Sequence, residues 1–148
     1  MSVILSSEKI FRKFNKTEYT SGFEIFAASV KNDQFVYVSC GQPNLIFCKK
    51  GIGAFPLVVN HDLNFQTAPM DFQSPLPSQL LGIGQHPPLN IGNQKVEPGD
   101  FCIAVSRSYV PPELFAADVN SLDLSSVSQI LANENPDVPF WLGILRFE

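Results

Sequence analysis

The segment from Val96 to Ser108 constrains the fold of this chain more than any other. It reads Val-Glu-Pro-Gly-Asp, then five apolar residues from Phe101 to Val105, then Ser-Arg-Ser. A Pro-Gly-Asp sequence favours a tight turn that the Asp side chain closes, and an uninterrupted apolar run is typical of a buried strand. We therefore expect Asp100 to close a turn and residues 101–106 to form a buried strand.

The composition favours one compact domain that is rich in strands. The chain has 148 residues, of which 45% are hydrophobic and 16% charged, so it can bury a sizeable core. Its 13 Phe and 12 Pro residues favour short strands joined by rigid turns. A net charge of -4 makes nucleic acid and an anionic membrane poor partners. We expect a single domain over residues 1–148 that binds neither of them.

The cysteines and the N-terminal sequence favour a location in a reducing compartment of the cell. Cys40, Cys48 and Cys102 are odd in number, lack CxxC spacing and lie in apolar contexts, which predicts buried free thiols in a reducing environment. The apolar run Val3–Leu5 is too short for a secretion signal, and no run reaches membrane-spanning length. We expect a cytoplasmic protein without a membrane segment.

A short amphipathic helix is expected near the N-terminus. Ser6 or Ser7 can cap a helix that ends near Glu18. Four cations recur on it at i, i+3, i+4 and i+7 and form one basic face: Lys9, Arg12, Lys13 and Lys16. Such a face either contacts only solvent or docks an acidic or phosphorylated partner.

Short apolar runs predict strands in the first half of the chain. They cover Phe23–Val30, Phe35–Ser39, Leu45–Cys48 and Ala54–Val59. The polar residues between the first two runs are typical of a hairpin, and the four runs together predict an antiparallel meander. The stretch from His61 to Pro88 is rich in Pro, Gln, Ser and Asn and predicts a long loop.

Two short helices and a strand are expected in the second half. Pro111 or Pro112 can begin a helix that runs to Ala117, because proline is tolerated in the first turn. A second helix is expected from Ser121 or Asp123 to Ala132, and its apolar face would contain Leu124, Val127, Ile130 and Leu131. Residues 140–147 predict the last strand. The fold class is therefore α+β, with antiparallel sheets and a few flanking helices.

Four segments, in the same order, resemble the PP2C-type (PPM) metal-dependent protein phosphatases, and especially their SpoIIE/RsbU-like bacterial branch. The run that ends at Ser106-Arg107-Ser108 is similar to the family's "E-P-G-D-x-L-x-L-x-S/T-D-G" strand. The segment from Phe35 to Phe47 is similar to "A-G-H-P-P-x-L-L" and the strand before it, and Leu80–Gly84 to "P-L-G-I". Residues 136–145 are similar to the closing "D-D-x-T-L-L-V-V" strand. The resemblance covers only the C-terminal part of the family domain, and it implies a truncated PP2C-like sandwich of two sheets.

The resemblance also implies that metal ligands are lost. In the family, the Asp of "S/T-D-G" and the first Asp of the closing motif bind Mg²⁺ or Mn²⁺; here these positions are Arg107 and Pro136. Asp137 recovers one ligand if the alignment shifts by one residue, and no Asp-Gly dipeptide occurs in the chain. A binuclear site needs several converging carboxylates. Arg107 repels a cation and can instead bind a phosphate or carboxylate group.

Other chemistry is weakly signalled. His61 with Asp62 and the isolated His86 lack the partners of a catalytic or metal site, and Gly82-Ile83-Gly84 lacks the Lys-Ser/Thr of a phosphate loop. Trp141 and the strand Phe residues are expected in the core, whereas an exposed member of this set would mark a partner surface.

Three functions are compatible with these observations. The first is a catalytically inactive PP2C/SpoIIE-like relative, without a cofactor, that binds another protein or forms a homodimer as a regulatory module in bacterial signalling. The alternative is a Mn²⁺- or Mg²⁺-dependent serine/threonine phosphatase whose site is completed by another chain or by Asp62, Asp71 or Asp118. The second alternative is a domain that binds a small ligand under the loop from His61 to Pro88.

Overall fold

The computed structural model describes residues 9, 12, 13, 22–41, 43–58, 80–82, 89–106, 110–134, 136, 137 and 139–148. The chain divides into two compact units. Unit 1 comprises residues 1–29, 36–42 and 62–93, and unit 2 comprises residues 30–35, 43–61 and 94–148. Within the described residues, no helix is long and apolar enough to span a membrane.

A three-stranded sheet holds β1 (Ile25–Lys31), β2 (Gln34–Cys40) and β5 (Asn90–Lys95) in the order β1-β2-β5. The β1–β2 hairpin turns at Asn32 and Asp33, whose φ angles of 49° and 61° are those of a two-residue turn of type I′. In unit 1, Gly92 of β5 lies so close to the buried Tyr37 ring that a Cβ at this position would overlap it. Phe23 and Leu81 form an antiparallel bridge with N···O distances of 3.0 and 2.9 Å.

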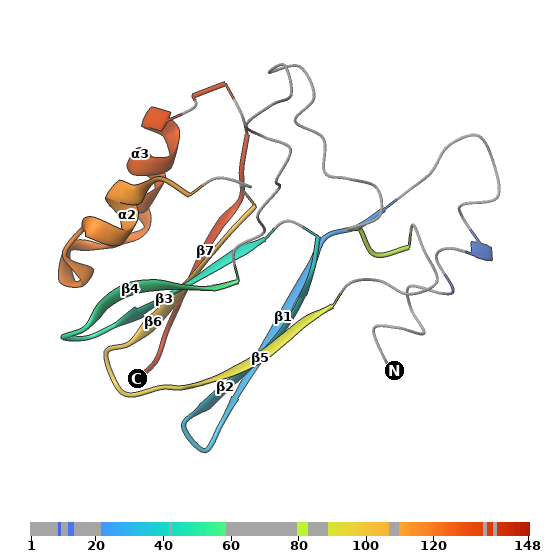
Figure 1. Cartoon of the computed structure of the whole chain (residues 1–148), viewed down its shortest axis with the longest axis horizontal. Helices are drawn as coiled ribbons and strands as arrows, with labels where there is room; N and C mark the ends of the chain where they lie inside the picture. Colours follow the sequence, from blue (N-terminus) through green and yellow to red (C-terminus); the bar gives the residue numbers. More distant parts are fainter. Residues whose placement is uncertain are drawn as a thin grey trace. The chain divides into compact units, whose positions relative to one another are not determined.

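Unit 2 is built around a four-stranded antiparallel sheet with the order β4-β3-β6-β7 (Figure 1). Its strands are β3 (Asn44–Lys49), β4 (Gly53–Val58), β6 (Phe101–Val105) and β7 (Leu142–Arg146). Strands β3 and β6 are in the centre, and all five residues of β6 are buried. The apolar run that follows the Pro-Gly-Asp turn therefore forms the buried strand that the sequence predicts.

Helices α2 (Pro112–Ala116) and α3 (Leu124–Glu134) lie on one side of this sheet, with the 3₁₀ helix η2 (Val119–Ser121) between them in sequence (Figure 1). Their apolar residues share one cluster with β3 and β6. Its buried members include Ile46, Ile103, Leu114, Val127 and Leu131. Burial of this cluster, at roughly 25 cal/mol per Å² of apolar surface, is the main force that holds the helices on the sheet.

A second group of aromatic rings packs in unit 2. Phe147 lies 5.2 Å from Phe35 and 6.1 Å from Phe47, measured between ring centroids. All three rings are at least nine-tenths buried. The prediction of core Phe residues is confirmed for these three and for Phe101.

Several sequence-based expectations are wrong. The four N-terminal strands do not form one meander, because β2 pairs with β1 and β5 whereas β3 pairs with β4 and β6. Strand β5 forms in a polar segment for which no strand was expected. Trp141 is 42% exposed and Leu124 is 58% exposed, so neither is a core residue. Most of the expected N-terminal helix and of the loop from His61 to Pro88 lies outside the described residues.

Candidate site at the end of strand β6

The end of β6 is held against the beginning of β7. The backbone N–H of Ser106 donates to the carbonyl of Trp141 at 3.2 Å, and the Ser106 Oγ accepts from the Trp141 N–H at 2.9 Å. The structure thus brings the strand end that precedes Arg107 together with the segment that follows Asp137. These are the two segments in which the resemblance places metal-binding carboxylates. Arg107 itself lies outside the described residues.

The described residues do not fit a binuclear metal site. Pro136 and Asp137 lie in an exposed turn after α3. No group of three or more His, Cys, Asp or Glu side chains converges within the described part of the chain. Asp118, an acid considered for an alternative site, instead caps η2: its Oδ1 accepts from the N–H and the Nδ2 of Asn120, both at 3.0 Å. Asp62, Asp71, His61 and His86 lie outside the described residues.

Three members of the expected basic face can be placed. Lys9, Arg12 and Lys13 have helical backbone geometry and are exposed, as an amphipathic helix requires. Lys16 lies outside the described residues, as do Ile83 and Gly84 of the short glycine segment. Gly82 is described, with a φ of 93° that favours glycine at this position.

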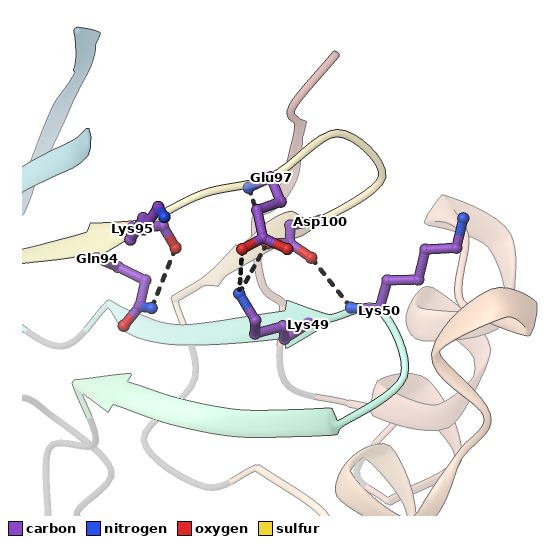
Figure 2. Close-up of polar contacts among 6 residues, drawn as sticks. All are labelled: Lys49, Lys50, Gln94, Lys95, Glu97 and Asp100. Atoms are coloured by element: carbon purple, nitrogen blue, oxygen red, sulfur yellow. Dashed lines mark hydrogen bonds and ion pairs between the residues drawn. The ribbon is translucent and has the colours of Figure 1, made fainter. Parts of the chain in front are cut away.

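The Asp100 carboxylate accepts two backbone hydrogen bonds, one on each oxygen (Figure 2). It is 2% exposed, and its Oδ2 accepts from the Glu97 N–H at 3.0 Å, which closes the turn over residues 97–100. Gly99 adopts a φ of 96°, so the Pro-Gly pair has the residue types of a type II turn. The predicted role of Asp100 as the residue that closes this turn is confirmed.

A second role of Asp100 is not evident from its own sequence segment. Its Oδ1 accepts from the Lys50 N–H at 3.0 Å, so one carboxylate ties the β3–β4 turn to the β5–β6 turn (Figure 2). The Lys49 Nζ lies 3.7 Å from Asp100 Oδ2 and 3.7 Å from Glu97 Oε1. Because both carboxylate oxygens already accept backbone hydrogen bonds, Asp100 is a structural residue. The adjacent Lys49-Lys50 pair was the only sequence signal for this contact, and it carries no information about a partner 50 residues away.

The three thiols are unsuited to nucleophilic chemistry. Cys40, Cys48 and Cys102 are free and buried, as predicted. Burial raises the pKa of Cys48 to about 12 and that of Cys102 to about 12, and it raises the pKa of Cys40 as well. A thiol attacks as its thiolate, which these environments disfavour at neutral pH.

Sequence reasoning did not locate an apolar surface along the β7 segment. Trp141 and Leu145 are 42% and 36% exposed, and both lie at β7, the last strand of the sheet. The alternation of apolar residues through this segment predicts a strand, but it contains no signal for the strand's position at a sheet edge.

Comparisons with known proteins support the resemblance at the level of the fold. No family model matches the chain, and no curated protein matches it. Among solved structures, the PPM Ser-Thr phosphatase MsPP from Mycobacterium smegmatis superposes with a TM-score of 0.68 at 17% identity. PppA, a key regulatory component of T6SS in Pseudomonas aeruginosa, gives 0.62 at 15% identity. The phosphatase domain of SpoIIE from Bacillus subtilis gives 0.51 at 10% identity.

The matches cover almost all of this chain but only part of the other proteins. They span 98% of this chain and 71% of MsPP, 98% and 67% for PppA, and 100% and 73% for SpoIIE. Two antiparallel sheets with a few helices are the arrangement expected from the resemblance. The chain has the α+β fold of the PP2C-type (PPM) serine/threonine phosphatases, and it spans about two thirds to three quarters of their length.

Proposed function

We propose that this chain is a PP2C-like domain without phosphatase activity that acts by binding another protein or a second copy of itself. The observation that carries this proposal is at the end of β6, where the sequence continues with Ser106-Arg107 in place of the acidic residue of the family motif. A guanidinium at this position repels a divalent cation. Among the described residues, Asp137 belongs to no group of three or more His, Cys, Asp or Glu side chains that could hold a metal ion, which supports the same proposal.

A binding function is supported by the exposed apolar residues along the β7 segment, of which Trp141 contacts the end of β6. Trp141 and Leu145 are aromatic and aliphatic side chains of the kind that contribute most to protein interfaces. A regulatory role is also compatible with the similarity to PppA, which is described as a regulatory component. The buried free thiols suit a reducing compartment, so we propose the cytoplasm as the site of action.

Calorimetric titration with Mn²⁺ and Mg²⁺, combined with hydrolysis of p-nitrophenyl phosphate in the same samples, tests the missing activity. We expect neither metal binding nor turnover, because the described carboxylates do not converge. Asp137→Ala and Glu113→Gln are the matched variants, since both alter an exposed acid.

Tight metal binding with turnover that disappears in Asp137→Ala and persists in Glu113→Gln would contradict the proposal. That result would instead support a metal-dependent serine/threonine phosphatase with Mn²⁺ or Mg²⁺ as its cofactor. It would also place Asp137 in the active site.

A further inference from the structure

Strand β7 has one edge without a strand partner among the described residues, because it is the last strand in the order β4-β3-β6-β7. Its other edge is paired with β6 in a register that places Leu145 opposite Cys102 and Gly143 opposite Ala104. The Ser106 N–H donates to the Trp141 carbonyl, and the Phe147 N–H donates to the Asp100 carbonyl, so Ser106–Trp141 and Asp100–Phe147 are hydrogen-bonded pairs.

Hydrogen-bonded pairs alternate with pairs that are not hydrogen-bonded along an antiparallel ladder. Gly143 and Leu145 therefore also direct their backbone groups toward β6.

The alternation leaves a regular set of hydrogen-bonding groups at the outer edge. Leu142, Ile144 and Arg146 direct their N–H and C=O groups away from β6. This spacing is the one that an additional antiparallel strand requires. Arg146 does not close this edge with its side chain, since the guanidinium donates to the Leu122 carbonyl at 3.2 Å and lies 4.9 Å from the centre of the Phe101 ring.

The opposite edge of the same sheet is protected against such pairing. Strand β4 contains Pro56, which has no N–H to donate, and its register with β3 shifts between Leu45 and Ile46. Proline and bulges are two devices that prevent edge-to-edge association. Strand β7 contains no proline, and its register with β6 is regular from Phe101 to Val105.

The sheet face beside the open edge is apolar and has room for a partner side chain. Trp141, Gly143 and Leu145 alternate on one face, and the first and last of them are the exposed apolar residues described above. A Cβ added to Gly143 would have no heavy atom of a described, non-adjacent residue within 4 Å. A large side chain from an added strand can therefore occupy the space above Gly143.

We propose that β7 pairs antiparallel with β7 of a second copy of this chain, centred on Ile144, so that the four-stranded sheets of two copies form one continuous sheet. This inference rests on the proposed binding function and names its surface and its occupant. Centring on Ile144 is the one register that uses the outward groups of Leu142, Ile144 and Arg146 on both copies.

The side chains in this register are complementary. Arg146 lies opposite Leu142 of the second copy, so the two guanidinium groups do not face each other. Leu145 lies opposite Gly143 of the second copy, where no described, non-adjacent residue lies within 4 Å of a Cβ position. The strand is thus compatible with itself in both charge and shape, as an isologous twofold contact requires.

Sedimentation velocity over a range of protein concentrations tests the proposal. We expect the wild-type chain to dimerise in a concentration-dependent manner. Gly143→Glu and Gly143→Lys should each weaken self-association by roughly tenfold or more, because the introduced charges lie close together near the twofold axis. An equimolar mixture of the two variants should restore dimers, since opposite charges then face each other. Ile52→Glu is the matched control, because it places a charge on an exposed apolar residue of the β3–β4 turn and should leave the dimer intact.

A second measurement uses the unmodified chain. Hydrogen exchange at the Ile144 and Arg146 amides should slow as the protein concentration rises, because these N–H groups gain a strand partner in the dimer that no described strand of one chain supplies. A chain that stays monomeric at every concentration would overturn the inference, whether the two amides exchange quickly or are protected by another segment of the same chain. A dimer that the Gly143 variants do not weaken would also overturn it. The metal and hydrolysis experiments are unaffected by these outcomes, so failure of the dimer and failure of the proposed function are distinguishable.

Discussion

Asp100 is a buried carboxylate whose role is structural, because its hydrogen bonds hold two turns together. Its two oxygens accept backbone N–H groups from Glu97 and Lys50, and the Lys49 ammonium partly balances its charge. Hydrogen bonds to an ionised group are stronger than those between neutral groups. A single side chain therefore fixes two turns at one end of the four-stranded sheet.

We predict that Asp100→Ala lowers the free energy of unfolding by about 3 kcal/mol, because two backbone donors lose their charged acceptor and the partly buried Lys49 loses a partner. Asp100→Asn keeps the shape and an acceptor oxygen, so it should be less damaging. Urea denaturation measures both variants. Glu97→Gln is the control, since Glu97 is exposed and its ion pair should contribute less than about 1 kcal/mol. An equal effect of Glu97→Gln and Asp100→Ala would show that the carboxylate does not hold the turns.

The thiols give a second prediction at the residue scale. Because burial raises the pKa of Cys48 and of Cys102 to about 12, their thiolate fraction at pH 8 is small. We expect both to react with iodoacetamide at least about a thousandfold more slowly in the folded chain than in urea. Mass spectrometry of peptides from a labelling time course measures each rate. Rapid native labelling of Cys102 would show that β6 is not the buried strand described here.

At the scale of elements, α3 shows how one exposed side chain starts a helix. The Asp123 carboxylate accepts the Ser126 N–H at 2.8 Å, and the Ser126 Oγ accepts the Asp123 N–H at 2.9 Å, which is a reciprocal capping arrangement. The hydrogen bond from the Ser126 backbone is the main reason that the pKa of Asp123 lies below its ordinary value. Val127 and Leu131 then turn the buried face of the helix toward the sheet.

We predict that this cap makes the stability of the chain depend on pH in acid. A carboxyl with a lowered pKa in the folded state stabilises the fold above its unfolded pKa, and this stabilisation is lost as the pH falls through the folded pKa. Asp123→Ala should therefore melt at a lower temperature than the wild type at pH 7, with a difference that shrinks in acid. Asp123→Asn keeps an acceptor oxygen but has no titrating group, so its melting temperature should change less with pH than that of the wild type. Thermal melts followed by circular dichroism compare the three chains, and a constant Asp123→Ala difference down to strongly acidic pH would contradict the prediction.

At the scale of the whole molecule, local sequence signals predict elements well and their partners poorly. The β1–β2 hairpin, β6, α2 and α3 follow from turn residues, apolar runs and caps that lie within a few positions of each other. Strand β5 was not predicted because Asn90–Lys95 contains only one large apolar residue. Its pairing with β2 depends on a segment that is distant in the sequence. The meander was wrong for the same reason, since the choice of β6 as the second partner of β3 depends on the folded sheet.

In the candidate site, too, the local features could be predicted from the sequence and the tertiary contacts could not. The Pro-Gly-Asp turn and the position of Arg107 can be recognised in the sequence, whereas the contact between Asp100 and Lys50 and the open edge of β7 depend on tertiary pairing. Trp141 was wrongly assigned to the core because an aromatic residue beside a strand is usually buried, and the position of β7 at an edge reverses this expectation.

We predict that the chain unfolds as a single domain, although it divides into two compact units. Strand β2 contributes residues to both units, so its backbone cannot unfold in one of them alone. Leu131→Ala should lower the free energy of unfolding by about 3 kcal/mol through a core cavity. Fluorescence of Trp141 and hydrogen exchange of the β1 and β2 amides should report the same loss. Two separate transitions would show that the units are independent domains.

The pairing of β3 with β6 has a consequence for how the chain folds during synthesis. Leu45 pairs with Ala104 and Phe47 with Cys102, so the two central strands are separated by more than 50 residues of sequence. On the ribosome, β3 is synthesised long before β6. The backbone groups of its apolar Leu45–Cys48 run that pair with β6 therefore remain unpaired until β6 is made. Such a segment can pair with the same segment of a neighbouring nascent or refolding chain. The yield of native protein should therefore fall as the concentration during refolding rises, and the β3–β4 hairpin should form well before the sheet is complete.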